Sequence, residues 1–462
     1  MSERNLAQVF KAYDIRGLSP EEIDAAFARR LGRAIAKVFK PKRVLVGRDM
    51  RTTSFPLESA LIEGLTTCGV NVVRIGMCST PSFNVLIGLG KGSFDLGVMV
   101  TASHNPGKYN GFKVTRGDCM PVGQGSGMEE LRDAYLADEK APSSQTGTVS
   151  DDPTAMTRYI DHILALADMP KDMPRMRVAI DAGNGMAGAV LPKLLSRLSW
   201  IESMPLYFDP DGTFPNHEAN PLKVETLKDL RRVVTNDECV VGVAFDGDAD
   251  RVGFVDETGE PVPGDILTAF FAREMLQKYP GGKVLYDIRS SWSVPEAVEA
   301  LGGTAEPTKV GHANIKKAMR VQGAMFAGEL SMHFYFKDIW YCESGDLAML
   351  ILLKTLAREG KPFSQLWLPL RKYAHSEEIN FEVKDALAVI ERLKETYAPK
   401  ATSVSDLDGI RIEFRDPADP ADAWWFNVRA SNTEPLLRLN VEAANPEALR
   451  ARMEEMTRAI KA

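Results

Sequence analysis

The sequence predicts an α/β protein: three related α/β domains with mixed, mainly parallel sheets, plus a smaller C-terminal α+β domain. A short apolar strand that ends in aspartate occurs three times, at residues 44–49, 178–181 and 284–287. A helical pattern and glycine-containing turns follow each strand, which is the order found in βαβ units. After Pro362 the pattern changes to separate strands with two helices. The 462 residues are enough for three or more domains.

The remaining predicted elements complete these repeats. In the first repeat we expect a helix at 54–68 and a second strand at 70–75, with Gly69 between them. Helices near 190–198 and at 295–301 take the same place in the second and third repeats. In the C-terminal domain we expect strands at 379–383, 409–414 and 424–428, and helices at 387–397 and 446–460.

Polar, turn-rich stretches indicate where the domains join. Residues 138–152 contain the run Ala-Pro-Ser-Ser-Gln-Thr-Gly, which is typical of a linker. Further joins are expected near 258–261 and 360–362, each with Gly and Pro. The expected domains therefore span residues 1–150, 151–257, 258–362 and 363–462.

Composition and charge indicate a globular cytoplasmic protein. Apolar residues make up 44% and charged residues 26% of the chain, and the net charge is −7. This balance argues against non-specific binding of nucleic acid or of an anionic membrane surface. The N-terminus lacks a signal-peptide pattern, and no apolar run reaches the about 18 residues of a membrane span. The five scattered cysteines form no C-x-x-C pair, which indicates reduced thiols and no zinc site.

A hydroxyl residue after a buried strand is the first candidate for chemistry. Residues 101–106, Thr-Ala-Ser-His-Asn-Pro, follow an apolar run at 96–100. We expect the strand to fix Ser103 and the loop to leave it exposed. A serine hydroxyl becomes a useful nucleophile only beside a base, a cation or a metal, and His104 is adjacent in sequence. A bare Ser-His pair would more often be an ordinary strand-ending turn.

Three carboxylates at alternate positions form the second candidate. Asp246, Asp248 and Asp250 follow an apolar strand and would bring oxygen ligands to one hard cation, magnesium or calcium. An EF-hand loop is the alternative, because Glu257 stands at its twelfth position. Arg251 at the sixth position, where that loop needs Gly, and the strand-like flanks oppose it. A solvated acidic turn is also possible, although three close like charges repel without a cation.

Two segments in the first domain offer further contacts to an anionic ligand. Tyr13 and Arg16 precede Gly17, in a segment that taken alone predicts a strand with a turn at the glycine. The guanidinium of Arg16 suits a phosphate group. Lys113 lies just downstream of Ser103, where it would act as an acid or base or offset phosphate charge. Taken alone, it would be a surface lysine on a strand.

Other candidates lie in the C-terminal half. Lys309 and His312 follow the second strand of the third repeat, where a βα crest would present them to a ligand; a lone His is more often structural. Between two strands of the last domain, a guanidinium, hydroxyls and an amide form a compact phosphate cradle, although composition alone would predict only a polar loop. The side chains of that cradle are Arg429, Ser431, Asn432 and Thr433.

Taken in order, these motifs resemble the α-D-phosphohexomutases, the phosphomannomutase/phosphoglucomutase family, over essentially the whole chain. Residues 101–106 resemble the active-site serine loop of that family, and 246–251 resemble its metal-binding loop. Residues 328–333 are similar to its sugar-recognition loop, and 429–435 to its phosphate-binding loop. The four expected domains would carry these loops in this order.

The resemblance implies an enzyme that interconverts the 1- and 6-phosphates of mannose or glucose. Phospho-Ser103 would exchange its phosphoryl group through a hexose 1,6-bisphosphate. The implied cofactor is Mg²⁺, which would bridge Ser103 and the three aspartates. Candidates for proton transfer are His104, Lys113 and His312. Residues that would contact substrate are Tyr13, Arg16, Arg251, Lys309, His312, Glu329, Ser331, Arg429, Ser431, Asn432 and Thr433.

One departure from the family pattern bears on the sugar. Met332 stands where the family has glycine, so a thioether would crowd the sugar or shift the backbone. A phosphoglucosamine mutase is the first alternative, but Leu330 stands where those enzymes usually have Gln. A non-catalytic sugar-phosphate-binding protein is the second, and the intact Ser103 and Lys113 disfavour it. The expected partners are small phosphosugars, without nucleic acid or membrane, and we expect a monomer or weak homo-oligomer.

Overall fold

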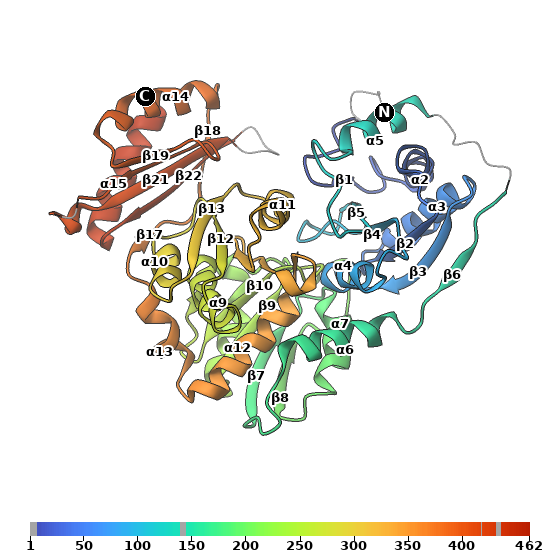
Figure 1. Ribbon diagram of the computed structural model, residues 1–462, viewed down its shortest axis with the longest axis horizontal. Helices are drawn as coiled ribbons and strands as arrows, with labels where there is room; N and C mark the ends of the chain where they lie inside the picture. The colour runs from blue at the N-terminus through green and yellow to red at the C-terminus, as the bar shows by residue number, and fades with distance from the viewer. Residues whose placement is uncertain (1–6, 139–144, 417, 431–435) are drawn as a thin grey trace. The chain divides into compact units, whose positions relative to one another are not determined.

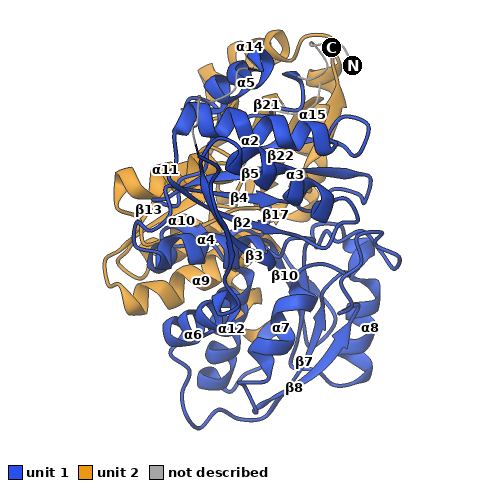
Figure 2. Ribbon diagram, turned by 90° about the vertical axis from the view of Figure 1, so that its right-hand side faces the viewer, with its two compact units in different colours: residues 1–262, 331–364 blue, residues 263–330, 365–462 orange. Residues whose placement is uncertain are grey.

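The computed structural model describes residues 7–138, 145–416, 418–430 and 436–462. The chain forms two compact units, which Figure 2 draws in blue and orange. The first unit contains Met1–Val262 and Ser331–Ser364, and the second contains Pro263–Leu330 and Gln365–Ala462. Each unit is described by itself.

The first sheet lies in the first unit and carries the serine loop (Figure 1). Its strands, in spatial order, are β1 (Ile15–Leu18), β5 (Tyr109–Arg116), β4 (Leu96–Val100), β2 (Arg43–Arg48), β3 (Asn71–Met77) and β6 (Val149–Asp151). Strands β4, β2, β3 and β6 run parallel. Strand β5 is antiparallel to β4, and β1 is antiparallel to β5. Its helices are α2 (Ala25–Phe39), α3 (Ser54–Thr66), α4 (Thr80–Leu89) and α5 (Met128–Ala137).

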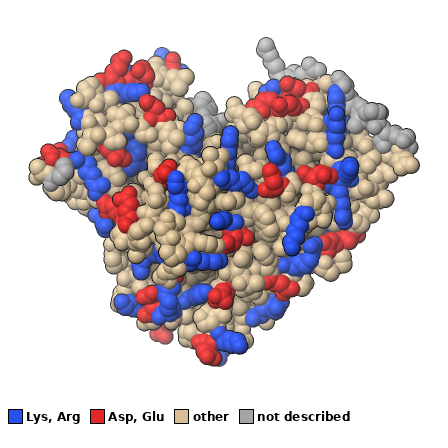
Figure 3. Space-filling view, viewed as in Figure 1, with Lys and Arg blue, Asp and Glu red and all other residues tan. Residues whose placement is uncertain are grey.

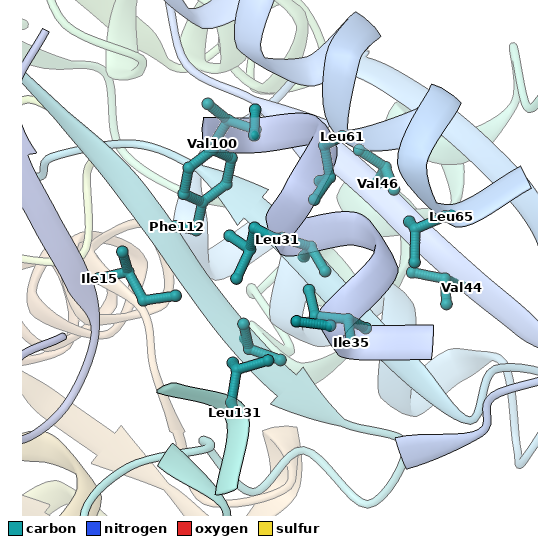
Figure 4. Close-up of a cluster of buried hydrophobic side chains, with 14 of the residues drawn as sticks. Ile15, Leu31, Ile35, Val44, Val46, Leu61, Leu65, Val100, Phe112 and Leu131 are labelled. Carbon is teal, nitrogen blue, oxygen red and sulfur yellow. The ribbon is translucent and has the colours of Figure 1, made fainter. Parts of the chain in front are cut away.

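An apolar core fixes this sheet against its helices (Figure 4). Leu31 of α2 and Leu61 of α3 are fully buried in it. The two helices approach closely because Gly64 faces the main chain of α2: a Cβ there would lie 2.1 Å from the carbonyl oxygen of Arg29. Burial on this scale supplies the main favourable term for holding β4 and β5 in place. Rigid strands therefore support the loop that follows β4.

The second sheet of the first unit carries the aspartate loop. Its strands, in order, are β11 (Pro261–Val262), β10 (Val252–Asp256), β9 (Val241–Phe245), β7 (Met176–Asp181) and β8 (Ile201–Leu206). Every residue of β9 and β10 is buried, so the turn between them is firmly anchored at both ends. The unit also contains α6 (Ala155–Ala167), α7 (Ala187–Leu195), α8 (Lys228–Asn236), β15 (Phe334–Phe336), β16 (Cys342–Glu343) and α12 (Gly345–Glu359).

The second unit has a parallel part and an antiparallel part. The parallel strands are β12 (Lys283–Asp287), β13 (Thr304–Thr308) and β14 (Phe326–Gly328), with helices α9 (Gly264–Lys278), α10 (Ser293–Glu299) and α11 (His312–Gln322). The antiparallel strands are β17 (Ala374–His375), β18 (Ile379–Glu382), β19 (Ser403–Ser405), β20 (Ile410–Phe414), β21 (Trp424–Ala430) and β22 (Leu436–Ala443). Helices α14 (Ala386–Tyr397) and α15 (Pro446–Lys461) accompany them; the units divide within α13 (Phe363–Trp367).

The predicted fold class is confirmed, with three local corrections. Gly17 is not a turn: it lies inside β1 and pairs with Asn110 of β5. The predicted linker at 138–152 ends in strand β6, which pairs with β3 because its extended backbone completes an open sheet edge. The predicted join near 258–261 likewise runs into β11, which pairs with β10.

Candidate active site

The serine loop begins directly after the buried strand β4. Ser103 adopts a left-handed backbone conformation with φ 52°, and its N–H donates to Thr101 Oγ1 at 3.0 Å. Its hydroxyl lies 3.2 Å from Asp246 Oδ2 and 3.3 Å from His104 Nδ1. The expected exposure is wrong: Ser103 is only 4% exposed, because neighbouring loops pack over it. The hydroxyl thus faces a carboxylate and an imidazole instead of bulk water.

Arg51 organises the loop around Ser103 and was missed by the sequence analysis. Its side chain is fully buried and its Nε donates to Asp49 at 3.1 Å. The rest of the guanidinium donates to main-chain carbonyls at 2.5–2.9 Å, those of Ser103, Asn105, Pro106 and Tyr109. A planar guanidinium has enough fixed donors to hold several acceptors at once. Arg51 therefore sets the path of the main chain that carries the hydroxyl.

The three aspartates converge as expected. One ligand oxygen from each of Asp246, Asp248 and Asp250 lies within 4.8 Å of the others, and all three side chains are buried. Strands β9 and β10 flank the loop, which excludes an EF-hand, and Glu257 accepts from the N–H of Ser364 instead. Among the described residues, the buried Asp248 Oδ1 has no hydrogen-bond partner. Three buried carboxylates with an oxygen left over fit a hard divalent cation.

The electrostatics of this loop also require positive charge. Burial, with the like charges of Asp250 and Asp248, raises the pKa of Asp246 well above its usual range. Burial opposes ionisation of Asp250 too, but the Lys113 and His333 side chains outweigh it and hold the Asp250 pKa well below its usual range. A bound cation would offset the repulsion among these carboxylates and favour the ionised form of Asp246.

Lys113 reaches the aspartate loop from strand β5. Its Nζ lies 2.7 Å from Asp248 Oδ2 and 2.7 Å from Asp250 Oδ2. Burial lowers the pKa of an ammonium, but these two carboxylates outweigh that effect, and the net shift of the Lys113 pKa is upward. It is therefore a charged counter-ion and not the surface lysine that a strand position alone would predict. In this arrangement it is poorly suited to accept a proton.

Arg251 and His333 complete the polar shell around the aspartates. Arg251 Nε lies 4.0 Å from Asp246 Oδ2 and 3.4 Å from His333 Nε2. His333 Nε2 is 3.2 Å from Asp250 Oδ1, and its Nδ1 is 2.9 Å from the hydroxyl of Ser331. Ser331 thus joins the aspartate loop through His333, a residue to which the sequence analysis assigned no role. The sequence signal that could have indicated this role is the position of His333, two residues after Ser331.

The opening segment also approaches the serine loop. Arg16 donates to Asn105 Oδ1 at 2.8 Å and forms an ion pair with Asp14. Tyr13 is half-buried in the turn before β1. His104 is mostly buried, and this burial, together with the cations Arg251 and Arg16, lowers its pKa well below the usual range. Its imidazole is therefore neutral at pH 7 and able to accept a proton.

The structure makes room for the side chain of Met332, the residue that departs from the family pattern. Its φ is 67°, a left-handed conformation that glycine adopts without strain, which accounts for a glycine at this position in the family pattern. The side chain is buried against Gly253 of β10: a Cβ on that glycine would lie 3.0 Å from Met332 Sδ. A glycine in β10 therefore makes room for the thioether.

The second unit brings together the remaining candidates. Glu329 Oε1 accepts from the N–H of Gly311 at 3.2 Å, so the sugar-loop glutamate touches the loop that carries Lys309 and His312. Lys309 is exposed, and His312 is the first residue of α11. The N–H of Leu330 donates to Asp287 at 2.6 Å, which fixes the glutamate loop to the end of β12.

Arg429 lies near the end of β21 and is buried. Its guanidinium donates to Glu378 at 3.0 Å. The other predicted members of the cradle, Ser431, Asn432 and Thr433, lie outside the described residues, so their positions stay a prediction. Glu378 was also missed by the sequence analysis, because nothing local marks it as a partner of Arg429.

Comparison with known proteins identifies the family. Models of phosphoglucomutase/phosphomannomutase match the chain in four parts: alpha/beta/alpha domains I (7–141), II (157–259) and III (263–373), and the C-terminal domain (378–459). The chain belongs to the phosphoglucomutase/phosphomannomutase family. It is thus a phosphohexomutase, an intramolecular phosphotransferase.

Individual relatives of this phosphohexomutase span its whole length. A phosphomannomutase of Methanocaldococcus jannaschii is 41% identical, over 97% of the chain and 96% of that protein. A phosphomannomutase of Escherichia coli K12 is 36% identical, over 98% and 97%. The crystal structure of a phosphoglucomutase/phosphomannomutase family protein from Burkholderia thailandensis, 33% identical, superposes with a TM-score of 0.87 over 98% of this chain and 97% of that one. Within the described residues, no helix has the length and apolarity of a membrane span.

The Arg51 contacts lead to a prediction about turnover. We expect Arg51→Lys to lower kcat about 100-fold, because a misplacement of about 1 Å at a reacting group has that order of effect. An ammonium cannot hold the same set of carbonyls. Hexose phosphate turnover would be measured beside thermal unfolding. Arg48→Lys is the matched control, since Arg48 is the last residue of β2, the strand that precedes Arg51, and pairs with Glu58. Wild-type kcat in Arg51→Lys would contradict this role.

The aspartate loop leads to a second prediction. We expect Asp248→Asn to lower turnover at least about 100-fold, because charge stabilisation at the serine is lost. Stability should change little, since the variant loses a charge that repels two other carboxylates, while Lys113 keeps its ion pair with Asp250. Any rise in melting temperature that a divalent cation gives the wild type should be lost in this variant. Asp209→Asn, at an exposed position, serves as the control. Full activity of Asp248→Asn, or of wild type in excess chelator, would reject a metal site.

Proposed function

We propose that this phosphohexomutase carries its phosphoryl group on Ser103 and interconverts hexose 1-phosphate and hexose 6-phosphate through a hexose 1,6-bisphosphate. The observation that supports this most directly is the 3.2 Å contact between the Ser103 hydroxyl and Asp246, inside a buried group of three carboxylates. A hydroxyl placed there would serve no packing purpose. It suits a phosphoryl group whose charge is offset by a cation.

The proposed transfer balances in two steps. In the first, an oxygen of the sugar hydroxyl forms a bond to phosphorus while the bond from phosphorus to Ser103 Oγ breaks. The hydroxyl proton passes to a nearby base and from there to the departing Ser103 Oγ, which becomes a hydroxyl. Neutral His104, 3.3 Å from Ser103 Oγ, is favoured over Lys113 by its lowered pKa, and His312 is the third candidate. In the second step the bisphosphate, turned end for end, returns its other phosphoryl group to Ser103. The bond from that phosphorus to the sugar oxygen breaks as a bond to Ser103 Oγ forms, and the proton of the Ser103 hydroxyl passes through a base to the freed sugar oxygen.

Magnesium is the proposed cofactor. Asp246, Asp248, Asp250 and an oxygen on Ser103 would hold it, because all-oxygen ligands from one short loop leave positions for water. When bound, it would offset the negative charge on the transferred phosphoryl group. Lys113, Arg251 and Arg16 would add to this compensation from their places beside the serine and aspartate loops.

Substrate recognition is assigned to a further set of side chains. Glu329 would accept hydrogen bonds from sugar hydroxyls, with Ser331 as an additional polar contact. Tyr13, Lys309 and His312 would also contact the phosphosugar. The phosphate that is not being transferred would be held by Arg429 with Ser431, Asn432 and Thr433. The Gly311–Glu329 hydrogen bond joins the loop of Glu329 to the loop that carries Lys309 and His312, which supports assigning all three to the substrate site.

Mannose and glucose phosphates are the proposed substrates. The relatives cited above carry the name phosphomannomutase, which supports mannose. Leu330 disfavours a phosphoglucosamine mutase, and the assembled Ser103, Lys113 and aspartate group disfavours a non-catalytic binding protein.

We also propose four domains at 1–150, 151–257, 258–362 and 363–462, in a cytoplasmic monomer or weak homo-oligomer. Five free cysteines are in keeping with a reducing compartment. Lys and Arg are interspersed with Asp and Glu on the face drawn in Figure 3, which does not favour a nucleic-acid partner.

The decisive test of this function is the serine. We expect Ser103→Ala to fall to near-background activity even when hexose 1,6-bisphosphate is supplied, because the site then lacks a phosphoryl acceptor. In the wild type, the bisphosphate should activate dephosphorylated protein, and intact mass should show one phosphoryl group that the variant lacks. Ser59→Ala, on an exposed face of α3, is the control. Steady turnover by Ser103→Ala would overturn the mechanism.

The sugar loop leads to a prediction about the two epimers. The proposed contacts of Glu329 are with hydroxyls away from C2, so glucose and mannose phosphates should react with similar efficiency. We expect kcat/KM values within about tenfold of each other, measured in coupled assays for both 1-phosphates. A ratio above about a thousandfold, roughly 4 kcal/mol of transition-state discrimination, would contradict dual specificity. Glucosamine 1-phosphate in the same assay tests the phosphoglucosamine alternative.

A further inference from the structure

Glu378 lies among three arginines in the second unit. Its Oε2 accepts from Arg289 Nη1 at 3.0 Å and from Arg429 Nη2 at 3.0 Å, and its Oε1 lies 3.1 Å from Arg438 Nη1. Burial raises the pKa of a carboxyl group, but these three cations outweigh it and lower the Glu378 pKa. Glu378 is therefore an ionised carboxylate that occupies the same guanidinium groups a phosphate would use.

The strand register explains why an anion is needed there. Arg429 of β21 and Arg438 of β22 are directly paired across the two strands. Like charges opposite each other destabilise a sheet unless an anion lies between them. Glu378, in the segment just before β18, supplies that anion. The charge of the paired arginines is thus partly offset from within the protein.

Arg289 connects this cluster to the sugar loop. Its guanidinium makes a two-point contact with Asp287, at 3.0 and 2.9 Å, and lies 3.7 Å from Glu329 Oε1. Arg289 thereby stands between Glu329, the proposed sugar ligand, and Glu378. Within the described part of the chain, three carboxylates (Asp287, Glu329 and Glu378) face three guanidinium groups (Arg289, Arg429 and Arg438), so these charges balance before any ligand arrives.

A phosphate at Arg429 would disturb this balance. It would bring up to two further negative charges next to Glu378, and the two anions would repel and compete for the same donors. Among the described residues, the buried Nε of Arg429 has no acceptor, so this guanidinium retains a donor beyond those that Glu378 uses. Arg429 can therefore be shared with an incoming anion.

We propose that Glu378 is an internal counter-ion that competes with the substrate phosphate for Arg429 and so limits how tightly the phosphate is held. This inference rests on the proposed function, in which Arg429 binds the phosphate that is not transferred. Such an enzyme must grip one phosphate, release it so that the bisphosphate can turn, and then grip the other. A carboxylate that replaces the departing phosphate lowers the cost of each release. Glu378 acts through Arg429 and is a positioning residue.

The test removes the charge while keeping the shape. In a Ser103→Ala background, which prevents turnover, Glu378→Gln should bind glucose 1-phosphate about tenfold more tightly by calorimetry. Glu377→Gln is the matched control, because the adjacent Glu377 is exposed; its affinity should stay within about twofold of the parent. With Ser103 intact, Glu378→Gln should lower both KM and kcat, since ground-state binding tightens and release slows. A merely structural role would not lower KM.

Stability gives an independent measurement. Without Glu378 the three arginines repel, so Glu378→Gln should melt at a lower temperature in phosphate-free buffer. Inorganic phosphate should then raise its melting temperature by more than it raises that of the parent. If the Gln variant does not fold, Glu378→Asp replaces it. The shorter side chain withdraws the carboxylate by one methylene and frees some of the arginine donors. Affinity for glucose 1-phosphate should then rise about threefold.

A second variant separates this inference from the function on which it rests. Arg429→Gln should weaken binding of glucose 1-phosphate more than tenfold. If it does, and the folded Glu378 variants bind no more tightly than the parent, the counter-ion role is overturned while the phosphate site stands. If Arg429→Gln binds as tightly as the parent, the phosphate assignment of Arg429 fails and the inference fails with it.

Discussion

The burial of three like charges in one short turn is the constraint on which the first unit depends. Carboxylates removed from water repel strongly unless opposite charge is close. Strand β5 supplies Lys113 at 2.7 Å from two of them, and the Arg251 side chain approaches a third. The two sheets of this unit are therefore joined through charge. The same excess of negative charge leaves a place for a divalent cation.

A common turn follows the first strand of each repeat and is put to different uses. Asp49 and Asp287 each accept from the N–H of the residue two positions on, and each pairs with the arginine at that position, Arg51 or Arg289. Asp181 makes the same main-chain contact with Gly183 but has no arginine there. In the first repeat the cation orders the serine loop, and in the third it links two acidic side chains. The same aspartate–arginine turn therefore supports both the proposed phosphoryl-transfer loop and the proposed sugar-binding loop.

The sequence predicted what depends on neighbours along the chain. The apolar strands and the Asp246–Asp250 alternation follow from local pattern, and both lie where expected. Gly17 was misjudged because a glycine within a strand resembles a turn until its pairing partner is known. The role of Arg51 was hidden for another reason: its acceptors on the serine loop lie 52 to 58 residues further along the chain. The burial of Ser103 also involves a distant segment, since Gly247 of the aspartate loop packs against its carbonyl oxygen.

The pairing of Met332 with Gly253 makes substitutions at these two positions depend on each other. A side chain at 253 would place its Cβ 3.0 Å from the methionine sulfur and 3.0 Å from Pro221. That spacing is tighter than an ordinary van der Waals contact, so both neighbours would have to give by a few tenths of an ångström. The effect of a substitution at 253 therefore depends on which residue stands at 332, although nearly eighty residues separate the two positions in the sequence.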